Sequence, residues 1–351
     1  PLDIWRRIWS HLESCGLREY FDSVVARTGT FRLLEPAAGV GSAVTSMPSW
    51  LHEACESGVA QWYCVELDVA TSRILKCVLP DAHVYNCSIH EAPIPHASMD
   101  LIVSNVPFGD YGVNDKSIDP RLRSSIHDYY FAKALQLVRV GGLVSFVTSH
   151  FTMNKRNQSV RRYIASRANL LDCVMLPSSA FKANAKTEVV TCVLTLQRVP
   201  KRDIVITSDS DIERDEAESR WRGFDWRKKR QNSDLNPANL EYTEDQDNAP
   251  EWCETYEFKR IDNYSTVTII HANQWFQSHP DRALGTLETS GTMYGQHDSL
   301  NLVCDRNDFL NRWDTVIQSP HSVADLMLLD AQETVDPKAV SYTHLTLPTK
   351  A

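Results

Sequence analysis

The segment Ser104-Asn-Val-Pro-Phe-Gly109 combines the groups needed to hold a flat exocyclic amine. An aromatic amine is a poor nucleophile, so a site that acts on it must fix the nitrogen in line with an incoming group. The side-chain oxygen of Asn105 and the carbonyl oxygen of Val106 are two acceptors, one for each N–H. Phe108 would stack on the ring, and Pro107 would fix the backbone so that both acceptors point inward. The alternative is a plain turn whose Phe joins a core.

Two glycines follow directly on a predicted strand in Leu33-Leu-Glu-Pro-Ala-Ala-Gly-Val-Gly41. At Gly39 and Gly41 the backbone can turn sharply and approach a ligand that a Cβ atom would exclude. In an open α/β sheet this is the carboxyl end of the first strand, where ligands bind. The dinucleotide fingerprint is incomplete, because Val44 takes the place of its third glycine. A nucleotide-type loop and an ordinary tight turn therefore both remain open.

An acidic residue ends the next predicted strand, Trp62-Tyr-Cys-Val-Glu-Leu67. Nucleotide-binding α/β folds place an acid at this position to accept two ribose hydroxyls. A strand-end carboxylate is often only a solvated turn residue, and that interpretation stays open for Glu66 alone. The glycine loop and Glu66 in register favour a nucleotide-like ligand.

Short apolar runs alternate with helical patterns from residue 31 to about 198, which is typical of βαβ units. The predicted strands, rich in β-branched and aromatic residues, are 31–36, 62–67, 83–85, 100–105, 143–148, 171–176 and 189–196. Residues 4–12 and 129–138 have helical spacing, and the second helix is expected to end at Gly141-Gly142. Seven strands predict a Rossmann-like, doubly wound α/β sheet that brings both motifs to one edge.

The order of the motifs resembles that of S-adenosylmethionine-dependent N6-adenine DNA methyltransferases: Glu35-Pro-x-x-Gly-x-Gly41, then Glu66, then Asn105-x-Pro-Phe108. More narrowly, the chain is similar to the methylase part of very large methylase–helicase proteins of phages, plasmids and conjugative elements. The segments that carry this narrower resemblance are Asn-Val-Pro-Phe-Gly and residues 126–135, 141–149 and 181–189. The resemblance is close over residues 1–198. It implies restriction-modification-type DNA methylation, DNA as a partner, and a helicase domain in the full-length chain.

The resemblance also implies roles for individual residues. The residues expected to line the methionine and ribose of S-adenosylmethionine are Glu35, Pro36, Gly39 and Gly41. Glu66 would bind the ribose hydroxyls, and Leu67 would pack on the cofactor's adenine. Asn105, Val106, Pro107 and Phe108 would be the catalytic tetrapeptide. Pro1 is expected to be the remnant of a Thr-Pro pair that touches the methionine carboxylate.

Two positions depart from the family pattern. Val106 replaces the first proline of the usual Asn-Pro-Pro-Phe or Asn-Pro-Pro-Tyr, and activity is expected because the carbonyl makes the contact. After the third strand the family offers an acid to the cofactor's exocyclic amine, whereas this chain has Cys87-Ser-Ile-His90. Ser88 is expected to accept that hydrogen bond only weakly.

Basic clusters suit contacts with DNA phosphates. The candidates are Lys155, Arg156, Arg161 and Arg162, with residues 227–230 after Trp221 and Trp226. The resemblance adds a polar loop at residues 181–188 that would help hold the flipped base, with Phe181 packing beside it and Lys182 contributing to DNA binding. A solvated charged face and a simple hairpin loop are the alternatives.

The composition is that of an ordinary globular protein. The chain has 351 residues, 36 basic and 45 acidic side chains, a net charge of −9 and 42% hydrophobic residues, which excludes disordered and collagen-like classes. Nine scattered cysteines without Cys-x-x-Cys spacing and 12 histidines without ligand spacing predict neither a disulfide framework nor a metal site. No membrane span or leader is visible, and the cysteine usage is typical of a reducing compartment, so a cytoplasmic location is expected. The resemblance implies that the cell is bacterial or phage-infected.

Four regions are expected: a methyltransferase domain at 1–200, a charged linker or insertion at 201–260, an accessory module at 261–338, and a translated sequencing-adapter remnant at 339–351. Residues 201–260 carry 16 acidic and 11 basic side chains, which is more than half of the net negative charge. The methylase part is therefore near-neutral, with local basic patches. The chain is expected to be a fragment of a longer protein.

Three functions fit these residues. Methylation of N6 of an adenine flipped out of DNA is the leading hypothesis. Glutamine methyltransferases that act on proteins use Asn-Pro-Pro-Tyr with the same two acceptors, and Phe108 in place of tyrosine disfavours this alternative. The third is a non-catalytic module of a larger helicase protein that binds cofactor or DNA, which the missing acid at Ser88 favours.

Overall fold

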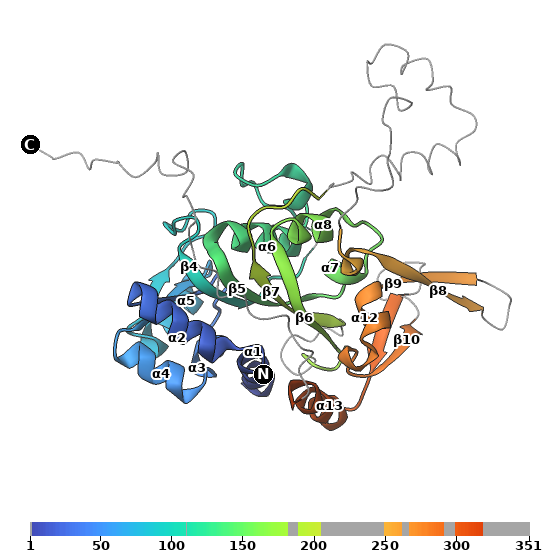
Figure 1. Ribbon diagram of the computed structural model, residues 1–351, viewed down its shortest axis with the longest axis horizontal. Coiled ribbons are helices and arrows are strands. Elements are labelled where there is room, and N and C mark those ends of the chain that lie inside the picture. Colours follow the sequence, from blue (N-terminus) through green and yellow to red (C-terminus); the bar gives the residue numbers. More distant parts are fainter. Residues whose placement is uncertain are drawn as a thin grey trace, which may run out of the picture.

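The computed structural model describes residues 2–109, 111–181, 189–204, 249–261, 267–290 and 299–318. Its centre is a seven-stranded sheet with the order β3-β2-β1-β4-β5-β7-β6 (Figure 1). The strands are β1 (Phe31–Glu35), β2 (Ala60–Val65), β3 (His83–Tyr85), β4 (Met99–Asn105), β5 (Val138–Ser149), β6 (Ala168–Leu176) and β7 (Thr191–Arg198). The first five pair in parallel, and β7 runs antiparallel between β5 and β6. The predicted α/β sheet of seven strands is confirmed.

Strand β4 shows why these residues form a central strand. Every residue from Met99 to Ser104 is buried, as expected for a parallel strand covered on both faces. Leu101 and Val103 belong to one hydrophobic cluster and Ile102 to the other, which is the period-two alternation of a strand.

Helices cover both faces of the sheet (Figure 1). On one face lie α1 (Leu2–Ser14), α2 (Leu17–Thr28), α3 (Ser42–Thr45), α4 (Ser49–Glu56), α5 (Val69–Val78) and α13 (Arg306–Gln318). On the other face lie η1 (Pro120–Leu122), α6 (Ile126–Leu137), α7 (Phe151–Asn154) and α8 (Ser159–Ala165). Trp9 of α1 meets Trp62 of β2 edge to face, with ring centroids 6.2 Å apart, which ties the first helix to the sheet.

The helix predicted at residues 129–138 is α6, but it ends before Gly141-Gly142. Its C-cap, Val138, is already extended, and β5 begins there. Gly141 has a φ of +80° inside the strand, where the register between β4 and β5 shifts. At Gly142 a Cβ atom would lie 3.0 Å from the carbonyl oxygen of Asp100 in β4. The glycine pair therefore forms a bulge that lets two strands approach, and not a helix end.

The C-terminal segments pack on the part of the chain that forms the sheet. They are η4 (Glu251–Cys253), β8 (Thr255–Ile261), β9 (Val267–Asn273), α12 (Gln274–Ser278), η5 (Pro280–Arg282), β10 (Thr286–Ser290) and β11 (Ser299–Val303). The N–H of Leu284 donates to the carbonyl of Met175 in β6 at 3.0 Å. Phe309 and Trp313 of α13 are fully buried in the cluster that contains α1.

A buried ionic cluster reinforces this packing. Arg282 Nε lies 3.1 Å and His11 Nε2 lies 3.4 Å from Asp172 of β6, so the cluster joins η5, β6 and α1. Burial lowers the pKa of His11 although Asp172 opposes this effect, so the imidazole is neutral at neutral pH. Removing one partner would leave a buried charge uncompensated, which is strongly destabilising.

The predicted linker at 201–260 is only partly described. Residues 205–248 lie outside the described residues, but η4 and β8 occupy the end of this range. Charged residues alternate with apolar ones there, so a high charge count does not exclude a strand. Residues 319–351, including the adapter-like sequence, lie outside the described residues, as does Pro1.

Candidate active site

The carboxyl ends of β1, β2 and β4 meet at one edge because these strands are parallel neighbours. β1 ends at Glu35, β2 at Val65 and β4 at Asn105. Strand β5 continues the edge, since Asn105 pairs with Val147. The glycine loop and the tetrapeptide Asn105–Phe108 therefore lie at the edge where open α/β sheets bind ligands.

The glycine loop is held by hydrogen bonds from its own backbone. The N–H of Ala38 donates to the carbonyl of Val65 at 2.9 Å, and the N–H of Gly39 donates to Glu66 Oε2 at 2.8 Å. Gly39 and Gly41 have φ values of +52° and +80°. A Cβ atom on Gly41 would lie 2.9 Å from Leu75 Cδ1 of α5. The loop thus needs glycine for both its backbone conformation and its close approach to α5.

The carboxylate of Glu66 is oriented by backbone donors on both oxygens. Oε2 accepts from Gly39, and Oε1 accepts from the N–H of Asp68 at 2.8 Å. Asn86 Nδ2 donates to the carbonyls of Glu66 and Leu67 at 2.9 and 3.0 Å. Each carboxylate oxygen can accept a further hydrogen bond, so the group is prepared for hydroxyl donors. Leu67 beside it is 70% exposed and offers an apolar surface.

Glu35 is a buried carboxyl without a full set of partners. It is 2% exposed, and its Oε2 atom has no hydrogen-bond partner among the described residues. Burial raises the pKa of Glu35 well above its usual value, and the nearby Glu66 raises it further. A buried polar atom of this kind is costly unless a ligand or water satisfies it.

The turn after β3 contains an acid that the sequence analysis did not consider. Glu91 Oε2 accepts the N–H of Ser88 at 3.1 Å, while the Ser88 hydroxyl lies 2.7 Å from His90 Nδ1. The hydroxyl of Ser88 is therefore already engaged. The spacing of three residues between Ser88 and Glu91 is a signal that could have revealed this carboxylate.

The tetrapeptide at the end of β4 is fixed through its backbone and open at its side chains. The N–H of Val106 donates to the carbonyl of Val147 in β5 at 3.1 Å, and the Val106 side chain is buried. Asn105 is exposed, and its side chain makes no hydrogen bond to the described part of the chain. Pro107 is half-buried, and Phe108 is 44% exposed. The amide and the aromatic ring are thus both available to a ligand.

A buried histidine at the end of β5 is a second feature that the sequence analysis missed. His150 Nδ1 lies 3.2 Å from Asn154 Nδ2, and Asn154 Oδ1 accepts the N–H of Asn273 at 2.9 Å. The bond from Asn273 orients the Asn154 amide, so its NH₂ group donates to Nδ1 and the imidazole carries its proton on Nε2. Burial lowers the pKa of His150 to about 4. The imidazole is neutral at pH 7.

The basic residues predicted to contact DNA fall into two groups. Arg161 is fully buried and donates to the carbonyls of Cys253 and Lys155, each at 2.8 Å. Arg162 is 5% exposed and lies 3.3 Å from Glu254. These two arginines hold the C-terminal segments, and the structure does not place them for phosphate contact. Arg156 is exposed.

Lys155 and the loop at residues 181–188 complete the predicted DNA contacts. Lys155 Nζ lies 2.5 Å from Asp128 Oδ2, so its charge is paired inside the protein. Phe181 is half-buried against the cluster that contains α1. Lys182 and the rest of the loop lie outside the described residues, as do Trp221, Trp226 and residues 227–230.

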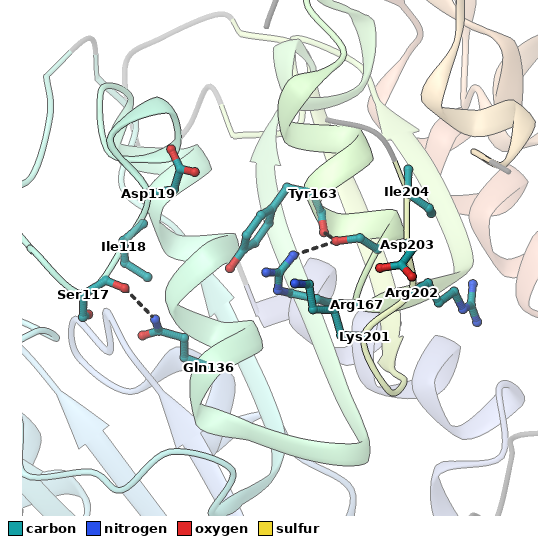
Figure 2. A pocket seen from close by; sticks show the side chains of 11 residues that line it. Ser117, Ile118, Asp119, Gln136, Tyr163, Arg167, Lys201, Arg202, Asp203 and Ile204 are labelled. Carbon is teal, nitrogen blue, oxygen red and sulfur yellow. Dashed lines mark hydrogen bonds between the residues drawn. The ribbon is translucent and has the colours of Figure 1, made fainter. Parts of the chain in front are cut away.

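A polar pocket of about 530 Å³ lies away from this site (Figure 2). Gln136 near the end of α6 and Arg167 just before β6 line it, so it belongs to the opposite edge of the sheet. The Arg167 guanidinium lies 3.9 Å from the centroid of the Tyr163 ring and donates to Ser166. The other lining residues are Ser117, Ile118, Asp119, Lys201, Arg202, Asp203 and Ile204. The pocket is therefore separate from the candidate active site.

Two further features concern metals and membranes. Within the described ranges, no three His, Cys, Asp or Glu side chains come together as metal ligands would. Across the same residues, no helix has both the length and the apolar character needed to cross a membrane.

Several solved structures are similar to this chain. The M protein of the type I restriction enzyme EcoKI is 16% identical, with a TM-score of 0.46 over 58% of this chain and 45% of that one. A Vibrio vulnificus protein described as the modification subunit of a type I restriction enzyme is 13% identical, with a TM-score of 0.44 over 63% of this chain and 52% of that one. The chain thus spans about half the length of these two proteins.

A Listeria monocytogenes protein described as a class I S-adenosylmethionine-dependent methyltransferase is 17% identical, with a TM-score of 0.41 over 59% of this chain and 69% of that one. No curated protein matches the chain. The model of the N-6 DNA methylase family matches residues 21–274, which include the glycine loop, the tetrapeptide and the sheet. The resemblance to N6-adenine DNA methyltransferases is thereby confirmed: the chain belongs to the N-6 DNA methylase family.

Proposed function

We propose that this chain transfers a methyl group from S-adenosylmethionine to N6 of an adenine that is flipped out of DNA. The observation that carries the proposal is the position of Asn105 at the end of β4, directly beside β1, whose end begins the glycine loop. An amine held by Asn105 would therefore face a cofactor held at β1. Family membership supports adenine in DNA as the substrate.

The residues at the ends of β1 and β2 fit S-adenosylmethionine. Gly39 leaves open space in the loop after β1, and the unpartnered Glu35 Oε2 is suited to a hydrogen-bond donor of the cofactor. Glu66 would accept the two ribose hydroxyls, and Leu67 would pack on the adenine ring. Ser88 stands where the family has an acid, and Glu91, which accepts the N–H of Ser88, is a carboxylate close to that position. When bound, the cofactor supplies an electrophilic methyl group on a positively charged sulfur.

The tetrapeptide would prepare the adenine amine for attack. The Asn105 side-chain oxygen and the Val106 carbonyl would each accept one N–H, which directs the nitrogen lone pair toward the methyl group. These acceptors also stabilise the positive charge that develops on the nitrogen during the displacement. Phe108 would stack on the base and replace the stacking that the base loses when it leaves the duplex.

The reaction releases one proton from the amine, and the site offers a path to water. Asn105 is exposed, so solvent reaches the nitrogen that it holds. His150, which follows β5, is buried and neutral, and its Nδ1 accepts from Asn154. Because its Nδ1 is already engaged, we propose that the proton leaves to water and not to this imidazole.

Wider features of the protein remain predictions from the resemblance: a helicase domain in the same full-length chain, an origin in a mobile element, and a cytoplasmic location. The division of the sequence at residues 200, 260 and 338 is also a proposal. For DNA binding we propose Arg156 as a phosphate contact, because it is exposed and follows α7, the helix after the carboxyl end of β5.

The test is transfer of tritiated methyl groups into DNA that lacks adenine methylation, with the product nucleoside identified by mass spectrometry. Wild type should form N6-methyladenine, and Asn105→Ala should not. Asn311→Ala, an exposed asparagine of α13 on the distant helix, is the matched control and should act as wild type.

A glutamine-bearing peptide offered beside the DNA tests the protein-substrate alternative. Methylation of the peptide instead of DNA would assign the glutamine reaction. Binding of S-adenosylmethionine in calorimetry without transfer to either substrate would favour the non-catalytic module. Equal incorporation by wild type and Asn105→Ala would show that the site is assigned wrongly.

A further inference from the structure

Tyr111 follows the tetrapeptide, and its ring is exposed at the candidate active site. It is 54% exposed, and Phe108 is 44% exposed. A Cβ atom on Gly109 would lie 2.4 Å from Cε1 and 2.7 Å from Cδ1 of Tyr111. The ring therefore lies on the backbone of the residue directly after Phe108. It has no ring contact and no hydrogen bond within the part of the chain that the structure describes.

Tyr111 also interacts electrostatically with Tyr130 of α6. Burial raises the pKa of Tyr130 on α6, and both Tyr111 and Glu66 raise it further. Both groups therefore lie within electrostatic range of the Tyr130 hydroxyl. The contact with Gly109 places the Tyr111 ring beside the end of the tetrapeptide.

The chain after Tyr111 is fixed by a buried carboxylate. Asp115 Oδ2 accepts from Tyr129 and Lys133 of α6, each at 3.0 Å, and Oδ1 accepts from the N–H and hydroxyl of Ser117 at 2.9 and 2.6 Å. Burial opposes ionisation, but the hydrogen bonds from Ser117 and Lys133 outweigh it and hold the pKa of Asp115 well below its usual range. The carboxylate stays charged at neutral pH.

The segment between Tyr111 and Asp115 is also braced by backbone contacts. The N–H of Val113 donates to the carbonyl of Arg123 at 2.9 Å. A Cβ atom on Gly112 would lie 2.6 Å from that same carbonyl oxygen, so the two backbones approach as closely as they can. Tyr111 therefore precedes a fixed segment, although its ring packs on no other aromatic ring of the described residues.

A second exposed aromatic residue at this edge differs in one respect. Phe151, after β5, is 49% exposed, but its ring already packs on the ring of His150 with centroids 4.2 Å apart. Tyr111 has no such neighbour. One side of the Tyr111 ring lies on the Gly109 backbone, and more than half of the residue is exposed and open to a flat partner that arrives with the substrate.

We infer that Tyr111 is a second aromatic contact of the target base, beside Phe108, and that Asp115 is the positioning residue that holds its loop. The inference rests on the proposed function and adds a base-binding residue to it. The partner is a flat heteroaromatic ring, for which stacking on an aromatic side chain does not depend on the hydroxyl. Tyr111→Phe should therefore preserve the contact, and Tyr111→Ala should remove it.

The experiment first maps the methylated adenine with wild type and then places 2-aminopurine, whose fluorescence is quenched by stacking, at that position of a duplex. Compared with wild type, Tyr111→Ala should raise the KM for DNA about tenfold or more and brighten the bound 2-aminopurine. Tyr111→Phe should keep the wild-type KM for DNA and the wild-type fluorescence. Phe151→Ala is the matched comparison and should leave the fluorescence unchanged. Affinity for S-adenosylmethionine, measured by calorimetry, should stay within twofold in all variants.

The outcomes separate this inference from the proposed function. If wild type methylates DNA but Tyr111→Ala keeps the wild-type KM and fluorescence, the inference fails alone. A loss of cofactor affinity in Tyr111→Ala would place the ring in the cofactor site, and a fluorescence change in Phe151→Ala alone would assign the contact to that residue. If wild type does not methylate DNA, the proposed function fails and the inference with it.

The role of Asp115 is tested by a double-mutant cycle. Asp115→Asn should raise the KM for DNA in the wild-type background and add little in the Tyr111→Ala background, since the loop then has no ring to present. Ser117→Ala, which removes one hydrogen bond to the carboxylate, is the milder variant if Asp115→Asn does not fold. Equal effects in both backgrounds would show that Asp115 only stabilises the fold.

Discussion

The two halves of the site edge are built differently. On the half proposed to bind the cofactor, both oxygens of Glu66 accept backbone N–H groups, and the glycine loop is bonded to β2. On the half proposed to bind the base, Asn105, Phe108 and Tyr111 are exposed, and only the backbone around them is fixed. In the first half the side chain of Glu66 is itself held in place. In the second half only the backbone is held, and the side chains are free of hydrogen bonds to the described residues.

The difference matches what each half is proposed to bind. A small cofactor from solution binds more tightly to a site that is already organised, because ordering the site costs free energy. A base that leaves a duplex brings its own ring and amine to groups that need free hydrogen-bonding capacity. The comparison predicts that changes on the two halves affect different measured quantities: cofactor affinity on one side, and turnover or DNA KM on the other.

The largest effect is expected from Asn105→Ala. Removing one of two acceptors for the amine takes away an interaction that strengthens as charge develops, so kcat should fall about 10²–10³-fold. The Kd for S-adenosylmethionine should stay within twofold, because Asn105 makes no hydrogen bond to the described cofactor half. Single-turnover kinetics and calorimetry measure the two quantities. A parallel loss of both would mean that the halves are not separate.

The next largest effect is expected from Glu66→Gln. Both oxygens accept backbone N–H groups, from Gly39 and Asp68, so an amide would always oppose one donor with another. The variant should weaken S-adenosylmethionine binding about tenfold to a hundredfold, which corresponds to the loss of one or two hydrogen bonds to a charged group. At saturating cofactor, kcat should recover. Unchanged affinity in calorimetry would refute the role of Glu66.

The sequence was sufficient for the parts of this site that depend on local pattern. Strands appear as β-branched runs, and the glycine loop and tetrapeptide follow directly on such runs. The helix end at Leu137 was predicted wrongly because Gly141-Gly142 is a helix-end signal in sequence and a bulge in the sheet, where the approach of Asp100 decides. Only the pairing of β4 and β5 distinguishes the two.

Contacts between distant segments explain the other differences. Arg161 and Arg162 have the composition of a phosphate-binding cluster, but their partners Cys253 and Glu254 lie about 90 residues away in the sequence. The sequence around the two arginines gives no indication of these partners. Asp115 is likewise held by hydrogen bonds from Lys133 and Tyr129 on a later helix, which its local sequence does not predict. Sequence patterns predict elements well, and they do not show which polar groups the fold will bury together.

A smaller effect is expected from Glu35→Gln, on stability and with a pH dependence. The folded-state pKa of Glu35 is raised, so the carboxyl costs no stability near its unfolded value of 4.5 and costs progressively more as pH rises above it. Glu35→Gln should therefore raise Tm at pH 8 by about 2–4 °C per kcal/mol of relief, and change it little at pH 4.5. Thermal unfolding without cofactor measures this. A gain that is the same at both pH values would contradict the assignment to this carboxyl.

The smallest effect is expected from Asp68→Ala, which separates a carboxylate of the fold from one of the site. Asp68 lies two residues after Glu66, but its Oδ1 accepts the N–H of Thr71 at 2.7 Å and so caps α5. That hydrogen bond lowers the pKa of Asp68, so the cap is present above pH 3.8 and lost as pH falls through the lowered value. Asp68→Ala should speed amide exchange in the first turn of α5 and leave the cofactor Kd within twofold. Asp68→Asn, which can still cap, should restore slow exchange. Both variants retain the backbone N–H of Asp68 that donates to Glu66. If Asp68→Ala nevertheless weakens cofactor binding, the cap of α5 contributes to the cofactor site, and this prediction is wrong.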